Sequence, residues 1–253
     1  EYYAMVLFSI LGMMLMTAAT ELLTAYIGLE LLTFSLYVLV SHNRGDHKSN
    51  EAGTKYILLG AFASALLLYG ISMVYGAVAL DSITSPTTFQ SISTYLQGRA
   101  SVQPLFLMGL VFIISSLGFK VAAVPFHMWT PDVYEGAPLP VTAYLAVGSK
   151  AAAFALVLRL FASAFLPAIQ EWQMVIAILA ASTMTLGNLV ALAQHNIKRL
   201  LAYSGIGQVG YLLMGLAALG MVGSNGSLTV FPGASNAIIL HLVGYGISNL
   251  GAF

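Results

Sequence analysis

The sequence has no cysteine and very little charge. Its 253 residues include nine lysines and arginines and nine aspartates and glutamates, together 7% of the chain, whereas soluble domains carry roughly a quarter charged residues. Without cysteine, the chain offers no thiolate metal site, no iron–sulfur ligation and no disulfide. Because 59% of the residues are hydrophobic, polar groups cannot cover the surface, and most of that surface is expected to face lipid.

Motifs for soluble catalysis and nucleotide binding are also missing. The sequence has no Walker A loop, no Gly-x-Gly-x-x-Gly after a strand and no nucleophile–base arrangement. Its two membrane-region histidines, His127 and His241, have no second histidine or carboxylate at metal-ligand spacing. The net charge is zero, which argues against nucleic acid as a partner. We therefore expect no cofactor, no metal and no nucleic acid on this chain.

Eight apolar stretches are long enough to span a bilayer, which takes about 20 residues per helix. They are rich in Leu, Ala, Met and Gly and show no period-2 alternation, which favours helices over a barrel. The sequence therefore predicts an all-α membrane protein, a polytopic helix bundle of about eight transmembrane helices. Both ends lie in or beside apolar runs, without an initiating Met or a signal peptide, so we interpret the chain as a fragment of a longer protein. The expected helices span residues 3–19, 22–40, 56–80, 104–127, 140–166, 173–194, 203–221 and 234–253.

Cations gather in the loops after the second and sixth segments, which lie on the same side by parity. The opposite side has essentially one arginine, in the long polar loop 81–103, where we leave open a short surface helix or a hairpin. Since positive loops stay inside, the first side is expected to face the cytoplasm across a bacterial plasma membrane; an organellar inner membrane or a thylakoid is the alternative. The cations of the two loops are Arg44, Lys48, Lys55, Lys198 and Arg199.

Four charged residues lie inside the apolar segments, namely Glu30, Lys120, Lys150 and Arg159; Arg159 lies nearer the outer end of its segment, where its side chain can extend to the interface. A charge at the bilayer centre costs at least about 2.5–3.5 kcal/mol, so such residues usually face the bundle interior, pair with one another and mark an ion or proton path. The alternative interpretation is a structural ion pair, or a lysine that extends to the interface.

A proline and two histidines accompany these charges. Pro125, in the stretch SSLGFKVAAVPFHMWTPDVYEG, removes a backbone donor five residues after Lys120. Interrupted helices at membrane depth recur at ion sites of transporters, although an ordinary kink has the same signature. His127 is either an interfacial residue or a proton shuttle. His241 is either a relay member or a helix–helix hydrogen bonder.

The stretch GFKVAAVPFHMWTPDVYEGAPLPVTAYLAVGSKAAAFA, residues 118–154, resembles the antiporter-like subunits of respiratory complex I. The wording TPDVYEGAP followed by SKAAAFA is most similar to the N-type branch of bacterial NADH:quinone oxidoreductase, equivalent to subunit 2 of mitochondria and chloroplasts. The stretches YIGLELLTFSLYVL around Glu30 and QHNIKRLLAYSGIGQVGYLLMG at 194–215 resemble the same family.

This resemblance implies inverted five-helix repeats with a proline-broken helix. Residues 1–166 would form the first repeat, helices 4–8 of the family, and 173–253 would begin the second. It implies a proton relay through the Glu30, Lys120 and Lys150 side chains, in a non-redox subunit of a proton-translocating enzyme. NADH, FMN, iron–sulfur clusters and quinone would bind to partner subunits, and K- and M-type subunits would be the neighbours. The matching lysine of the second repeat would lie beyond residue 253.

The expected mechanism depends on a charge pair. At about 4 Å and an effective dielectric of 20, a pair is worth about 4 kcal/mol, so Glu30 would control whether Lys120 keeps its proton or passes it toward Lys150. Two other hypotheses stay open: an Mrp-type cation/proton antiporter subunit, and a membrane scaffold whose charges are structural.

Overall fold

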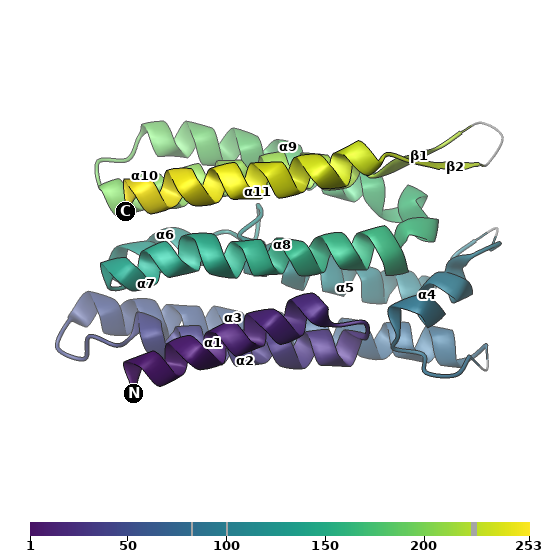
Figure 1. Ribbon diagram of the computed structural model, residues 1–253, viewed down its shortest axis with the longest axis horizontal. Helices are drawn as coiled ribbons and strands as arrows, with labels where there is room; N and C mark the ends of the chain where they lie inside the picture. The colour runs from purple at the N-terminus through teal and green to yellow at the C-terminus, as the bar shows by residue number, and fades with distance from the viewer. Residues whose placement is uncertain (82, 100, 224–226) are drawn as a thin grey trace.

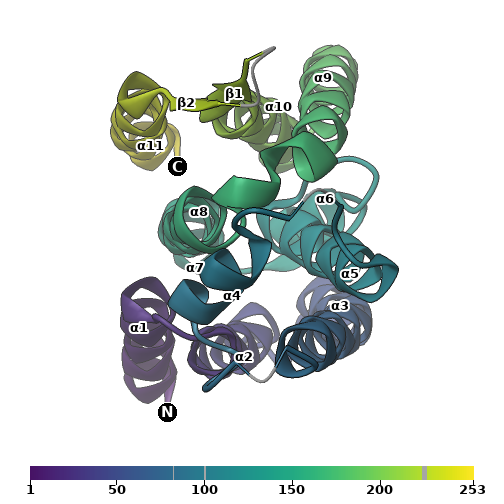
Figure 2. The ribbon, with the colours of Figure 1, turned by 90° about the vertical axis from the view of Figure 1, so that its right-hand side faces the viewer.

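The helices form three layers with their long axes side by side (Figures 1 and 2). The computed structural model describes residues 1–81, 83–99, 101–223 and 227–253. One outer layer holds α1–α3, the middle layer holds α5–α8, and the other outer layer holds α9–α11. The elements are α1 (Tyr2–Ala18), α2 (Leu22–Val40), α3 (His47–Ala79), α4 (Phe89–Leu96), α5 (Pro104–Val121), α6 (Trp129–Gly136), α7 (Leu139–Tyr144), the π-helical turn η1 (Leu145–Ser149), α8 (Lys150–Arg159), the π-helical turn η2 (Leu160–Ala164), the 3-10 turn η3 (Leu166–Ala168), α9 (Ile169–Leu192), α10 (Ile197–Ala217), β1 (Gly220–Val222), β2 (Leu228–Val230) and α11 (Pro232–Ala252).

The predicted all-α bundle is confirmed, because a helix occupies each of the eight expected segments. Among the described residues, six helical segments are long and apolar enough to cross a membrane; α1, with 17 residues, is shorter, and α11 is not among the six. Their outer faces expose large apolar side chains, such as Ile27 at 62% and Phe62 at 66%. Apolar faces of this extent suit a lipid environment. The division into inverted repeats at 1–166 and 173–253 stays a prediction.

Two helices begin at least six residues earlier than the apolar pattern predicted. Helix α3 starts at His47 rather than residue 56, and α10 starts at Ile197 rather than residue 203. In each case a side-chain oxygen of the preceding residue, Asp46 or Asn196, accepts the backbone N–H two positions later, at 3.0 and 2.9 Å. These caps stabilise polar first turns, which hydropathy alone assigns to loops.

The fourth predicted segment is wrong over residues 122–127. Helix α5 ends at Val121, and Ala122 adopts a left-handed conformation with φ 67°. The N–H of Ala123 donates back to the Gly118 carbonyl at 2.8 Å, a closure typical of helix C-termini. Pro125 follows in the connection, and the chain is helical again only from α6. The break therefore begins before the proline, directly after the turn that carries Lys120.

The end of the bundle opposite the α2–α3 loop carries two small elements (Figure 1). Helix α4 resolves the choice left open for the loop 81–103, of which residues 82 and 100 lie outside the described part. The side chain of Thr88 accepts the N–H of Ser91 at its start. The antiparallel hairpin β1–β2 pairs Gly220 with Val230. It was not predicted, and it replaces the end of the helix expected at 203–221.

Helices α1 and α2 touch through their backbones. A Cβ placed on Gly12 would lie 2.5 Å from the Leu32 nitrogen, and one on Gly28 would lie 2.6 Å from the Met16 nitrogen. Small residues allow such close approach between membrane helices. Backbone atoms cannot rotate away as side chains do, so these two glycines fix the α1–α2 distance.

We predict that Gly12→Ala or Gly28→Ala lowers the free energy of unfolding by about 1–3 kcal/mol, because an added methyl group must push the helices apart. The control is Gly76→Ala in α3, whose added Cβ would meet only Leu105 Cδ2, at 3.6 Å. Thermal unfolding of the detergent-solubilised full-length protein measures the difference. Equal transition temperatures for Gly12→Ala and Gly76→Ala would show that the α1–α2 contact is loose.

Candidate functional site: two buried lysines and a charged cluster

Lys120 lies in the last turn of α5 and is only 4% exposed. Its Nζ donates to the Thr33 hydroxyl on α2 at 2.6 Å, and this hydroxyl donates to the Leu29 carbonyl at 2.6 Å. A lysine ammonium has three donors. Among the described residues, the Thr33 hydroxyl is the one side-chain acceptor of Lys120 Nζ. The sequence-based expectation of a buried lysine beside an interrupted helix is confirmed.

Glu30 lies on the same face of α2 as Thr33, since residues three apart are neighbours on a helix. Its carboxylate is half-buried and accepts the Ser64 hydroxyl of α3 at 2.7 Å. Among the described residues no ion pair joins it to Lys120. The direct contact assumed from the sequence is therefore not formed, because each of the two groups is held by its own hydroxyl.

Protein groups hold the backbone of the break between α5 and α6. The Val124 N–H donates to the Thr183 hydroxyl of α9 at 3.0 Å, and the Trp129 indole donates to the Phe119 carbonyl at 2.9 Å. Pro125 itself is exposed. Irregular backbone at membrane depth needs such partners, so the break next to Lys120 is stabilised by specific contacts with α6 and α9.

Lys150 is the second buried lysine, with 2% of its surface exposed. It follows directly after the π-helical turn η1, a type of turn that is frequent at functional sites. Its Nζ donates to the Gly205 carbonyl of α10 at 3.2 Å. The Tyr134 and Tyr245 rings lie 5.7 and 5.8 Å from Nζ. No carboxylate pairs with Lys150 in the part of the chain that the structure describes.

The two predicted histidines lie apart from each other. His127 lies in the α5–α6 connection, and its buried Nδ1 has no hydrogen-bond partner among the described atoms. His241 on α11 likewise has a buried, unpartnered Nε2, and its ring meets Tyr211 edge-on at 6.1 Å. It lies one helical turn before Tyr245, whose ring lies 5.8 Å from Lys150 Nζ, whereas no hydrogen bond joins His127 to either lysine among the described residues.

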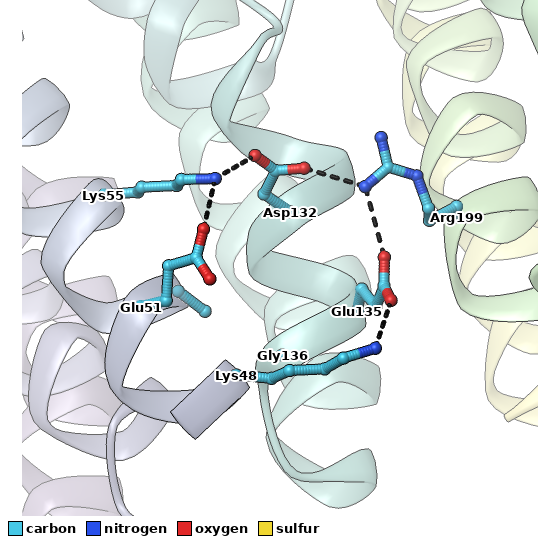
Figure 3. A pocket seen from close by; sticks show the side chains of 8 residues that line it. Lys48, Glu51, Lys55, Asp132, Glu135, Gly136 and Arg199 are labelled. Atoms are coloured by element: carbon cyan, nitrogen blue, oxygen red, sulfur yellow. Dashed lines mark hydrogen bonds and ion pairs between the residues drawn. The ribbon is translucent and has the colours of Figure 1, made fainter. Parts of the chain in front are cut away.

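A group of paired charges joins α6 to both α3 and α10 at the end of the bundle where the α2–α3 and α9–α10 loops lie (Figures 1 and 3). Asp132 accepts Lys55 Nζ at 2.7 Å and Arg199 Nη1 at 2.8 Å. Glu135 accepts Lys48 Nζ at 2.9 Å and the same Arg199 nitrogen at 3.2 Å. These side chains surround a pocket of about 190 Å³. The charged cluster consists of Lys48, Glu51, Lys55, Asp132, Glu135 and Arg199.

The cations hold both α6 carboxyl groups in the ionised form. Hydrogen bonding from Lys48 is the main reason that the pKa of Glu135 lies below its usual value. Burial acts to raise the pKa of Asp132, but hydrogen bonds from Lys55 and Arg199 outweigh it and lower the pKa. Within the described residues, no three acidic or histidine side chains gather to hold a metal ion. The arrangement is thus an ion-pair network rather than a metal centre.

Sequence reasoning missed this cluster. It used Lys48, Lys55 and Arg199 only for membrane orientation, and it assigned no chemistry to TPDVYEG. The signal was present, since Asp132 and Glu135 are three apart and face one way on a helix. The lysines at 48 and 55 are seven apart, two helical turns on one face of α3. The convergence of the two cationic loops at one end confirms the parity argument; which side is cytoplasmic stays a prediction.

Comparisons with known proteins agree with this geometry. The family model described as "NADH:quinone oxidoreductase/Mrp antiporter, TM" matches residues 19–253. The NADH-quinone oxidoreductase subunit N of Desulforamulus reducens is 50% identical over 89% of this chain and 46% of its own length. That of Trichlorobacter lovleyi is 46% identical over 100% of this chain and 49% of its own length. The chain thus spans about half the length of the curated relatives it matches.

Solved structures show the same fold. A chain of respiratory complex I from Thermus thermophilus is 35% identical with a TM-score of 0.75, covering 98% of this chain and 50% of that chain. A chain of the Mrp complex from a Dietzia species is 23% identical with a TM-score of 0.80, covering 97% of this chain and 42% of that chain, a likeness of fold alone. The chain therefore belongs to the NADH:quinone oxidoreductase/Mrp antiporter family of membrane proteins.

Proposed function

We propose that this chain is part of a proton-translocating membrane subunit of an NADH:quinone oxidoreductase, of the N type. The observation that carries the proposal is the pair of buried lysines, each held by one neutral oxygen. The names of relatives 44–50% identical to the chain support the N-type assignment, and the solved neighbours are multi-subunit membrane complexes. The subunit itself would carry no redox centre. NADH, FMN, iron–sulfur clusters and quinone would belong to partner subunits, with K- and M-type subunits as neighbours.

The chemistry follows from the competition between burial and hydrogen bonding. Burial penalises the charged form of a lysine, whereas a hydrogen-bond acceptor favours it. A lysine held by one hydroxyl or one carbonyl, with no carboxylate beside it, is therefore poised to gain or lose a proton. Such a group can carry a proton through lipid, while a lysine in a tight ion pair would hold its proton.

Glu30 is the group that would set the direction of transfer. Glu30 lies one turn from Thr33 on the same face of α2, and the Thr33 hydroxyl accepts Lys120 Nζ. If Glu30 turns from Ser64 toward Lys120, its charge favours the protonated lysine. If it turns back, Lys120 can release the proton toward Lys150. In this proposal Pro125 belongs to the break that lets the end of α5 move, and His127 and His241 are additional proton carriers.

We predict that Lys120→Met, Lys150→Met or Glu30→Gln, each in the assembled complex, lowers proton translocation per NADH by an order of magnitude or more, since each removes one proton carrier. The measurement is proton uptake into sealed vesicles during NADH oxidation. Arg44→Met is the control, because this exposed arginine has no ion pair among the described residues. Unchanged stoichiometry in all three variants would favour a scaffold whose charges are structural.

The Mrp-type antiporter is the second candidate, because the description of the family model that matches residues 19–253 includes Mrp antiporters. The two functions differ in the ion that they need. An antiporter subunit would restore growth at high sodium concentration to a strain that lacks its own sodium exporters. The same assay with the NADH:quinone oxidoreductase subunit would give no rescue.

A further prediction concerns the carbonyl that holds Lys150. A Cβ on Gly205 would lie 2.9 Å from Lys150 Nζ and 3.0 Å from the Tyr245 hydroxyl. We therefore expect Gly205→Ala to displace the ammonium group and to slow proton translocation several-fold without preventing assembly. Gly233→Ala is the control, since an added Cβ there meets nothing within 4 Å. Wild-type pumping in Gly205→Ala would mean that the Gly205 contact is dispensable.

A further inference from the structure

The proton path proposed above does not use the charged cluster. Its side chains lie at the end of the bundle, with Lys48 69% exposed and Glu135 22% exposed. All six members are paired with one another. Isolated surface ion pairs contribute little to stability, so stability alone does not explain why all six charged side chains are paired. The cluster lies between the three helices α3, α6 and α10, as Figure 3 shows, and this position suggests a role in holding them together.

Helix α6 has contacts on two sides that leave little freedom. Toward α3, a Cβ on Gly136 would lie 2.4 Å from the Lys48 carbonyl oxygen and 2.6 Å from Ala52 Cβ. Toward α10, Lys198 Nζ donates to the carbonyls of Glu135 and Ala137 at 3.1 and 2.8 Å. The α3 side therefore includes a direct backbone contact, whereas on the α10 side the hydrogen bonds and ion pairs among the described residues come from Lys198 and Arg199.

Helices α6 and α10 each supply one contact of Lys150, beside that of Tyr245 on α11. Tyr134, whose ring faces Lys150 Nζ, lies between Asp132 and Glu135 on α6. Gly205, whose carbonyl accepts Nζ, lies six residues after Arg199 on α10, about 9 Å along a rigid helix at 1.5 Å per residue. Any sliding of α10 against α6 would thus change the position of the carbonyl relative to the ring.

We propose that Asp132, Glu135 and Arg199 are positioning residues for Lys150. Arg199 bridges both carboxylates and so locks α10 to α6. This lock fixes the Gly205 carbonyl and the Tyr134 ring around Nζ, and it sets how readily Lys150 exchanges its proton. The inference rests on the proposed function, in which Lys150 carries protons.

The network is suited to a permanent lock. Both carboxyl pKa values lie below their usual values, so the carboxylates stay ionised at neutral pH. A group with a lowered folded-state pKa contributes stability above its unfolded-state pKa, and this contribution is lost as the pH falls through the folded-state value. The lock is therefore closed at working pH and opens only in acid. The charged groups that face the two carboxylates are Lys48, Lys55, Lys198 and Arg199. The titratable groups that face Lys150 are the tyrosines Tyr134 and Tyr245.

We predict that Arg199→Gln in the assembled complex breaks the Lys150–Gly205 hydrogen bond, lowers proton translocation several-fold and shifts its pH profile, while NADH oxidation continues. Arg199→Lys keeps the positive charge but lacks the planar guanidinium that can bridge two carboxylates. We therefore expect it to retain more proton translocation than Arg199→Gln but less than the wild type. Arg44→Gln, another arginine at the same end of the bundle, is the matched control. Two measurements are made on each variant. The first is a cryo-electron microscopy structure of the complex, and the second is the rate of proton translocation over a series of pH values from acidic to alkaline.

The structure of the Arg199→Gln variant tests the positioning role of Arg199 independently of whether Lys150 carries protons. A Lys150–Gly205 contact that stays in place in Arg199→Gln overturns the lock, whatever happens to pumping. A displaced contact with an unshifted pH profile also overturns it, since Lys150 would then be insensitive to its neighbours. If Lys150→Met pumps normally, the proposed function fails instead. Should Arg199→Gln not assemble, Glu135→Gln, which keeps an acceptor, is read by the same two measurements.

Discussion

The burial of two lysine side chains without carboxylate partners is the constraint on which the rest of the structure depends. Each would cost at least about 2.5–3.5 kcal/mol at the bilayer centre, and a bundle has a simple way to avoid that cost, an ion pair with Glu30. The described structure holds Lys120 on a hydroxyl and Lys150 on a backbone carbonyl instead. The cost is thus not removed by an ion pair at either lysine, as the proposed role in proton transfer requires.

Irregular backbone accompanies each buried lysine. Lys120 is followed within two residues by the left-handed Ala122, and Lys150 directly follows the π-helical turn η1. Regular helices satisfy their own backbone groups, although a helix carbonyl can accept a second donor, as that of Gly205 does from Lys150. Breaks release N–H and carbonyl groups, which must then find partners elsewhere. Here Thr183 and Trp129 take up the groups at the first break, so the surroundings of Lys120 are held by three different helices.

Local features could be predicted from the sequence, and long-range ones could not. Eight apolar runs gave eight helices, and the rarity of charge singled out Glu30, Lys120 and Lys150. Helix starts at His47 and Ile197 were missed, because their polar first turns depend on caps rather than on hydropathy.

The larger errors concern contacts between distant parts of the chain. Opposite charges suggested a direct Glu30–Lys120 pair, but Ser64, distant in the sequence, holds the carboxylate. The charged cluster was missed for the same reason, since it joins residues 48–55, 132–135 and 199. Its members sit in three segments that look like ordinary loops when each is considered alone.

The contrast between the two kinds of charge explains the layout of the molecule. In the charged cluster at the end of the bundle, each carboxylate and each cation has an ion-pair partner. Inside the bundle, the lysines are left with neutral partners, so their charge is free to vary. A helix that is tied at one end by fixed charges and that contacts a variable charge further along can transmit its position to that charge. Helix α10 meets this description, with Arg199 near its start and the Gly205 carbonyl six residues later, and this is why we propose that an arginine outside the proposed proton path matters to a lysine within it.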